Sequence, residues 1–149
     1  MSSYAVELRT VDGGATALGW SGPHSVVVDR PAEAGGRGLG FNGGQLLYLA
    51  VAACWSNDLY REAATRGIRL TRVRIAVDGG FSGRGAASDP IVVDIEVEGD
   101  ATEAELQALV DEVDAIAEIP RSIREGTPMT LGSRRLTALV GSPAQPGKG

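Results

Sequence analysis

The stretch NGGQLLYLAVAACWSNDLYREAATRG, residues Asn42 to Gly67, decides the fold of this chain. Its residues 44–66 predict a long helix, and Gly67 is placed to end it because glycine readily takes the left-handed conformation of a helix cap. The first half of this helix is apolar on every side, unlike a surface helix, which has one apolar stripe. The helix therefore needs cover on most sides, and a second copy of the chain is the simplest source of that cover.

Strand patterns come before and directly after this helix. Apolar and polar residues alternate in residues 4–10, and two further apolar segments, residues 15–20 and 24–30, follow at tight turns. These patterns predict a three-stranded opening. Residues 72–79 and 91–99 also alternate with the period of a strand and predict a hairpin with a long loop.

A second helix is predicted after the hairpin. Thr102 and Glu105 have the spacing of a capping box at its start. We expect the helix to end near Ile119 because Pro120 follows. Its residues form one apolar stripe made of Leu106, Leu109, Val110, Val113 and Ile116.

The last part of the chain predicts a closing strand pair, residues 127–131 and 134–140. The whole order predicts an α+β class with largely antiparallel sheets around a buried central helix. We expect one domain over residues 1–141 and a disordered tail over residues 142–149.

Composition excludes several partners. The chain has 149 residues with 43% hydrophobic content, enough for one domain with a real core. Its net charge of -5 argues against nucleic acid and anionic membranes, which attract basic surfaces. The longest apolar run, residues 46–55, is too short to cross a bilayer. A single cysteine and no apolar export segment favour the cytoplasm.

That single cysteine, Cys54, lies where the apolar run turns polar. It can be a small buried hydrophobic residue or a nucleophile. A nucleophile needs a pKa lowered from about 8.5. Cys54 lies too far into its own helix to use that helix's dipole. Asp58, at i+4, would oppose ionisation if it faces the sulfur, whereas Arg61, at i+7, would favour it.

Three further arginines, Arg37, Arg121 and Arg124, are candidates to stabilise a thiolate from outside this helix, and the sequence does not choose among them. His24 has no Cys or His nearby in the sequence, so we expect no metal site. The glycine-rich residues 35–44 lack the Lys-Ser/Thr ending of a phosphate-binding loop and no parallel βαβ unit surrounds them. We therefore expect no cofactor and interpret these residues as a flexible entrance loop.

Several of these residues together resemble the OsmC/Ohr family, the osmotically inducible and organic hydroperoxide resistance proteins. The resemblance runs from about Val11 to Val140, and its most specific pieces are Gly35-Gly36, Asn42, Gln45-Leu46-Leu47 and Ala52-Ala53-Cys54. It implies an intertwined homodimer in which sheets from both chains wrap two central helices. It also implies a peroxidase, in which Cys54 attacks the peroxide oxygen and becomes a sulfenic acid.

The chain departs from the pattern of this family at four positions. The family's second cysteine, which condenses with the sulfenic acid, falls on Ile119. The family's glutamate falls on Gly44 and its proline on Gly43. Its activating arginine falls on Gly13, and the nearest arginine in sequence is Arg9. No internal disulfide can form, so turnover would need an external thiol reductant.

Two functions are consistent with this sequence. The first is thiol-dependent reduction of organic hydroperoxides or related electrophiles in oxidative stress defence, with Cys54 as the nucleophile. A hydrophobic small-molecule substrate would then contact apolar pocket walls, for which we expect Phe41, Leu47, Val51 and Trp55. The alternative is a non-catalytic dimer that binds a hydrophobic small molecule, with Cys54 as part of the lining.

Overall fold

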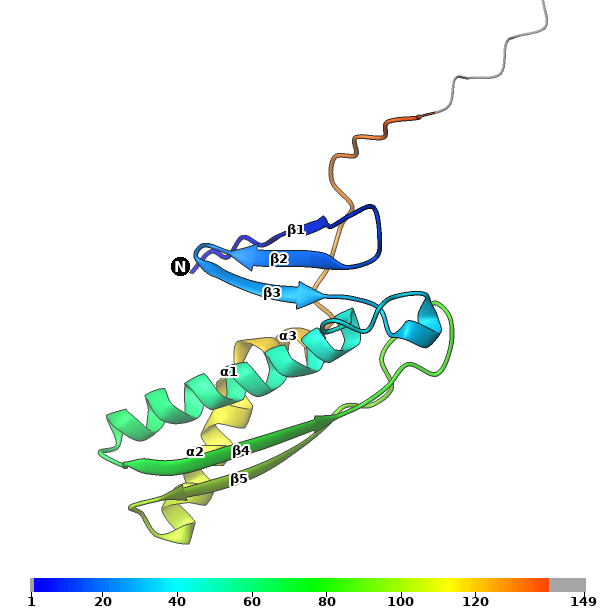
Figure 1. Ribbon diagram of the computed structural model, residues 1–149. Coiled ribbons are helices and arrows are strands. Elements are labelled where there is room, and N and C mark those ends of the chain that lie inside the picture. Colours follow the sequence, from blue (N-terminus) through cyan, green and yellow to red (C-terminus); the bar gives the residue numbers. More distant parts are fainter. Residues whose placement is uncertain (1, 140–149) are drawn as a thin grey trace, which may run out of the picture.

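The computed structural model describes residues 2–139 of the 149. It has an α+β fold with two antiparallel sheets, which confirms the predicted class (Figure 1). The elements are β1 (Glu7–Thr10), β2 (Ala17–Ser21), β3 (His24–Val28), the short 3-10 helix η1 (Ala32–Ala34), α1 (Gly43–Thr65), β4 (Leu70–Asp78), β5 (Val92–Gly99), α2 (Glu103–Ile116) and α3 (Glu118–Glu125). The predicted tail, residues 142–149, lies outside the described residues.

The long helix α1 is the centre of the fold. It begins with a capping box in which the Asn42 side chain accepts the Gln45 N–H and the Gln45 side chain accepts the Asn42 N–H, each at 2.9 Å. It ends before Gly67, whose φ is +65°. One face of α1 packs against α2 and against Ala117, which follows α2. The buried core there consists of Val51, Trp55, Leu59, Ala63, Leu109, Val113 and Ala117.

The hairpin β4–β5 covers the same core from the other side. Its inward residues pair across the strands as Val73 with Val97, Ile75 with Ile95 and Val77 with Val93, and all six pack against the core. The outward residues carry charge, and Arg74 forms an ion pair with Glu96 at 2.8 Å. The alternation in sequence therefore predicted both the strands and their inward faces.

The predicted end of the second helix is wrong. The capping box of Thr102 and Glu105 is present, but α2 ends at Ile116 and a separate helix, α3, begins at Glu118. Pro120 lies in the first turn of α3, where the N–H that proline lacks has no partner within the helix. Pro120 therefore belongs to a helix start, and Gly126, with φ +62°, ends that helix.

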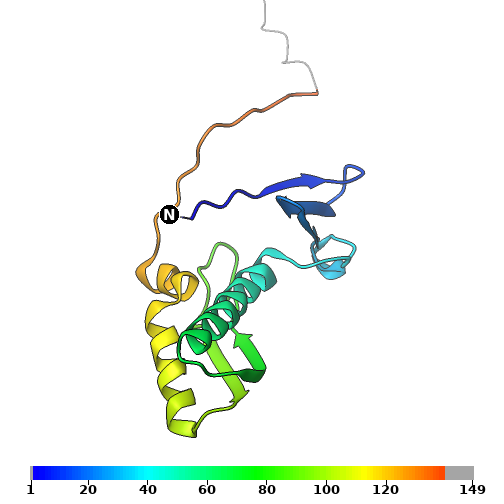
Figure 2. The ribbon, with the colours of Figure 1, turned by 90° about the vertical axis from the view of Figure 1, so that its left-hand side faces the viewer.

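The predicted closing strands are also wrong for the residues that the structure describes. Residues 127–139 contain no strand, and the side chains of Met129 and Leu136 are 95% and 88% exposed. Figures 1 and 2 show this segment leaving the body of the molecule, and the β1–β3 sheet likewise stands apart from β4–β5. A strand needs a neighbour for its backbone hydrogen bonds, and residues 127–139 find none in the described part of their own chain.

Within the described residues, no helix combines the length and the apolar character needed to cross a membrane.

Candidate functional site

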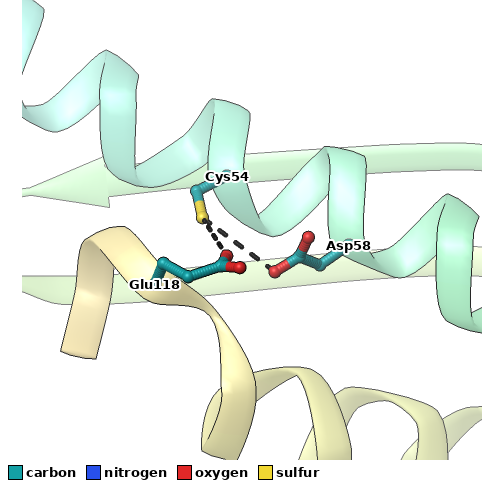
Figure 3. A group of neighbouring side chains, drawn as sticks. All are labelled: Cys54, Asp58 and Glu118. Atoms are coloured by element: carbon teal, nitrogen blue, oxygen red, sulfur yellow. Dashed lines mark hydrogen bonds between the residues drawn. The ribbon is translucent and has the colours of Figure 1, made fainter. Parts of the chain in front are cut away.

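Cys54 lies on α1 where the start of α3 crosses it (Figure 3). Its Sγ is 3.9 Å from Glu118 Oε2 and 4.0 Å from Asp58 Oδ2, and the thiol can donate to either carboxylate. Cys54 is half-buried, Asp58 is 3% exposed and Glu118 is exposed. The thiol therefore sits between a buried and an exposed carboxylate and is open to solvent on one side.

Two different elements bring these carboxylates to the thiol. Asp58 follows Cys54 by one helical turn, so both side chains lie on the same side of α1. Glu118 is the first residue of α3, and the fully buried Ala117 before it belongs to the core that packs on α1. The break between α2 and α3 is thus what places a carboxylate opposite the sulfur.

Arg61 binds the far side of the buried carboxylate. Its Nη1 donates to Asp58 Oδ1 at 2.6 Å, and its Nε donates to Glu62 at 2.8 Å. Burial raises the pKa of Asp58, and Arg61 opposes that rise by favouring the ionised carboxylate. The second oxygen of Asp58, Oδ2, faces Cys54 instead of a cation.

The surroundings of Cys54 favour the thiol over the thiolate. Burial raises the pKa of Cys54, and the negative charges of Asp58 and Glu118 raise it further. The backbone N–H groups of Ile119 and Glu118 oppose this rise, because the N-terminal end of α3 faces the sulfur. The net direction of the Cys54 pKa is upward from its ordinary value, which disfavours the thiolate. The effect predicted for Asp58 from its i+4 position is confirmed.

In the described residues, none of the arginines that the sequence offered is among the largest influences on the Cys54 pKa. Arg61 binds Asp58 and Glu62, Arg121 binds Glu125, and Arg124 binds Asp114. Arg9, the arginine nearest in sequence to the position of the family's activating arginine, pairs with Glu7 and lies over the Trp20 ring. The groups that favour an anion here are the amides at the start of α3, which the sequence did not reveal.

The four predicted pocket residues do not form one wall of this chain. Val51 and Trp55 are 2% and 3% exposed and belong to the core. Phe41 is 43% exposed and pairs with Val28 in an isolated bridge, and Leu47 is half-buried. Cys54 packs against the edge of the core that contains Val51 and Trp55. A substrate pocket made of these four residues remains a prediction.

Within residues 2–139, cavities lie near these elements. One, of about 510 Å³, is mainly apolar and lies between the β1–β3 sheet and the start of α1, with Val6, Leu8, Trp20, Val26, Val28 and Leu46 in its lining. The other, of about 460 Å³, lies beside β5 and α2 and is lined by Trp55, Val110, Asp111 and Arg124 among others. Cys54 lines neither cavity.

The glycine-rich loop is anchored instead of free. The Asp29 carboxylate, 3% exposed, accepts the Thr16 hydroxyl at 3.0 Å and the backbone N–H groups of Arg30, Arg37 and Leu39 at 2.8, 3.2 and 3.2 Å. Amides that would otherwise be free to cradle a phosphate are therefore bound to an internal carboxylate. These hydrogen bonds fix part of the loop, and the flexibility expected for residues 35–44 stays a prediction.

The sequence interpretation also missed Glu118. The family resemblance offered an indication of this position, because it places the residue before Pro120 close to Cys54. That residue is Ile119, which offers no polar side chain, and the neighbouring Glu118 occupies the space opposite the sulfur.

Comparisons with known proteins agree with this architecture. The family model described as OsmC-like protein matches residues 35–132, about two thirds of the chain. The chain belongs to the OsmC-like protein family. Among curated proteins, none matches its sequence.

Solved structures share the fold at low sequence identity. An OsmC-like protein from Mycoplasma pneumoniae is 18% identical, with a TM-score of 0.71 over 83% of this chain and 88% of the other. An organic hydroperoxide resistance protein OsmC from Legionella pneumophila is 18% identical, with a TM-score of 0.58 over 83% and 90%. One from Elizabethkingia anophelis, also named as an organic hydroperoxide resistance protein, is 18% identical, with a TM-score of 0.59 over 83% and 89%.

In this OsmC-like protein, an aromatic ring lies beside one of the positions where the chain departs from the family pattern. At Gly44, where the resemblance expects a glutamate, a Cβ would lie 3.0 Å from the Phe81 ring. Phe81 comes from the β4–β5 loop and stacks on Tyr48, with ring centroids 6.3 Å apart. A side chain at position 44 would require this ring to shift slightly.

Proposed function

We propose that this OsmC-like protein reduces organic hydroperoxides or related electrophiles, with Cys54 as the nucleophile. The observation that supports this most directly is a half-buried thiol within 4.0 Å of two carboxylates and opposite the backbone amides of α3. The names of the Legionella and Elizabethkingia relatives point to the same chemistry.

In this proposal a carboxylate moves the proton that the reaction requires. Cys54 Sγ attacks the peroxide oxygen distal to carbon, and its proton passes to Glu118. The O–O bond breaks, and Glu118 returns the proton to the departing alkoxide, so one thiol and one hydroperoxide give a sulfenic acid and an alcohol. The amides of Glu118 and Ile119 stabilise the negative charge that develops on sulfur.

The sulfenic acid is returned to the thiol by an external thiol reductant. A first thiol condenses with it and releases water, which leaves a mixed disulfide on Cys54. A second thiol attacks that disulfide, restores Cys54 and leaves as the oxidised reductant. The chain has no second cysteine to do this internally. A reducing cytoplasm would supply such thiols, and we place the protein there.

The working form in this proposal is a homodimer. Tyr4 and Val6 lie just before β1 and are 88% and 82% exposed, and Leu8 within β1 is 52% exposed. On the outer side of α1, Leu49 and Tyr60 are each 48% exposed. A helix with exposed apolar groups opposite its buried face fits cover by the equivalent helix of a second copy. The apolar residues of the segment 127–139 would find strand partners in the same assembly.

A second candidate function is binding of a hydrophobic small molecule without chemistry. The cavity of about 510 Å³ favours it, because its lining is mainly apolar and its size suits a small ligand. A second copy that covers the β1–β3 sheet would close this cavity from outside.

Consumption of cumene hydroperoxide in the presence of dithiothreitol tests the first function. We expect turnover by the chain, none by Cys54→Ser, and a lower rate for Glu118→Gln because the proton relay is lost. Glu125→Gln is the matched control, since Glu125 is an exposed glutamate of the same helix that binds Arg121. Turnover equal to that of Cys54→Ser would refute the proposal, and tight binding of an apolar dye by such a protein would favour the second function.

A further inference from the structure

We propose that Cys54, Asp58 and Glu118 form a binding site for a divalent cation of the zinc type. Each residue offers one ligand atom, and the sulfur and the two carboxylate oxygens all lie within 4.8 Å of one another. Thiolate and carboxylate are both ligands that Zn²⁺ uses in proteins. The proposal goes beyond peroxide reduction, since a metal bound here would occupy the reactive sulfur.

The distances suit a tetrahedral ion. With Zn–S near 2.3 Å and Zn–O near 2.0 Å, tetrahedral angles place sulfur and oxygen about 3.5 Å apart. The observed separations from Cys54 Sγ are 3.9 Å to Glu118 and 4.0 Å to Asp58. Closing the site requires each sulfur-to-oxygen separation to shorten by about half an ångström. The two carboxylate oxygens, which lie within 4.8 Å of each other, must also approach. Glu118, the exposed member, has the freedom to make most of that movement.

The charges also suit a divalent ion. A thiolate and two carboxylates carry three negative charges, and Arg61 compensates one of them by binding Asp58 Oδ1 at 2.6 Å. The other oxygen of this buried side chain has no cationic partner in the described residues, and its one recorded contact is the thiol at 4.0 Å. Within residues 2–139, Glu118 likewise forms no ion pair. Because Arg61 is shared with Glu62, at least two negative charges of the three ligands remain uncompensated, and a divalent cation would neutralise two of them.

The surroundings provide the other parts of a metal site. Arg61 holds Asp58 in place from behind, and the amides of Glu118 and Ile119 face the sulfur, as supporting groups around metal ligands do. The exposed side of Glu118 leaves room for entry of the ion and for a water as a fourth ligand. Binding would displace the thiol proton to solvent, so Cys54 would be held as a metal-bound thiolate and shielded from electrophiles.

Titration of the reduced, chelator-treated full chain without a histidine tag tests this site, with Co²⁺ as the spectroscopic probe and Zn²⁺ as competitor. We expect one Co²⁺ per chain, a sulfur-to-cobalt charge-transfer band in the near ultraviolet, and loss of that band on addition of Zn²⁺. Cys54→Ser should abolish the band. Glu118→Gln should weaken binding at least tenfold, because it removes a ligand from an exposed position without disturbing the core.

Glu125→Gln serves as the control on the same helix and should bind Co²⁺ as the unaltered chain does. Absence of a sulfur-to-cobalt band would overturn the proposal. The proposal would also be overturned if Glu118→Gln bound Co²⁺ with the same affinity as the unaltered chain. The peroxide assay with chelator present is independent of this titration. If the chain binds cobalt but does not reduce peroxide, the metal site stands and the proposed peroxide reduction is refuted. If the chain reduces peroxide but does not bind cobalt, the proposed function stands and the metal site is refuted.

Discussion

Replacing Glu118 by Gln should make Cys54 of the metal-free protein react faster with iodoacetamide near neutral pH. The substitution keeps the size of the side chain and removes a negative charge 3.9 Å from Sγ. That charge opposes ionisation of the thiol, and alkylation proceeds through the thiolate. The expected result is therefore a larger thiolate fraction and a proportionally faster reaction.

The size of the effect follows from Coulomb's law. Two unit charges about 4 Å apart repel by about 1 kcal/mol in water, and an exposed side chain such as Glu118 justifies the dielectric constant of water. A change of about 1.4 kcal/mol is tenfold, so we expect alkylation to accelerate roughly fivefold. The amides of α3 remain in the variant and leave their contribution unchanged.

The measurement is the second-order rate of iodoacetamide addition to Cys54 at fixed ionic strength with chelator present, followed by mass spectrometry. Glu125→Gln carries the same change of net charge on the same helix and should react at the rate of the unaltered chain. A Glu118→Gln rate equal to or below that of the unaltered chain would refute the electrostatic argument. A pH titration of the rate should show the same sign, with the rise in reactivity beginning at lower pH in the variant.

Three further predictions concern the fold that holds this site. Leu109→Ala should lower the free energy of unfolding by about 2 to 5 kcal/mol in urea denaturation, because the side chain is fully buried in the core; a loss under 1 kcal/mol would contradict this packing. Asp29→Asn should reduce the loss of stability that the protein shows in acid. Burial raises the pKa of Asp29, but hydrogen bonds from Leu39, Arg30, Thr16 and Arg37 outweigh burial and lower it. The ionised carboxylate therefore stabilises the fold fully above its ordinary pKa of 3.8, and this stabilisation is lost as the pH falls through the lower pKa of the folded state. Melting curves of the unaltered chain and the variant that are parallel across that acid range would disprove this linkage. Gly40→Ala should lower the melting temperature because its Cβ would lie 2.2 Å from the Val27 carbonyl oxygen, whereas Gly43→Ala, which meets nothing within 4 Å, should not; equal melting temperatures would argue against the close approach.

The parts of the fold that the sequence predicted correctly are those set by local patterns. The end of α1 before Gly67, the capping box of α2 and the alternation in β4 and β5 depend on residues near one another in the chain. The end of the second helix was predicted wrongly because a proline that follows one helix and a proline in the first turn of the next give the same pattern in the sequence. The segment 127–139 misled because strand pairing depends on a partner, which its own described chain does not provide.

The site was predicted less well than the fold for a physical reason. The charge state of Cys54 depends on groups within about 4 Å, and two of them, Glu118 and the amides of α3, come from a helix more than sixty residues away in sequence. The candidate arginines Arg61, Arg121 and Arg124 are bound to carboxylates. The helix break after Ala117 instead brings Glu118 and the amides of α3 to the sulfur.

The two proposals for this site use one property of it, the excess of negative charge around a thiol, in different ways. As a proton acceptor Glu118 favours peroxide reduction, and as a ligand it favours a bound cation that would shield the same sulfur. Glu118→Gln should therefore slow peroxide reduction and weaken cobalt binding while it speeds alkylation. A general disturbance of the fold would move reactivity toward peroxide and toward iodoacetamide in the same direction, because both reagents would gain or lose access to Cys54 together. Opposite changes of these two rates in one variant are the result expected when the carboxylate acts on both the proton and the charge of the thiol.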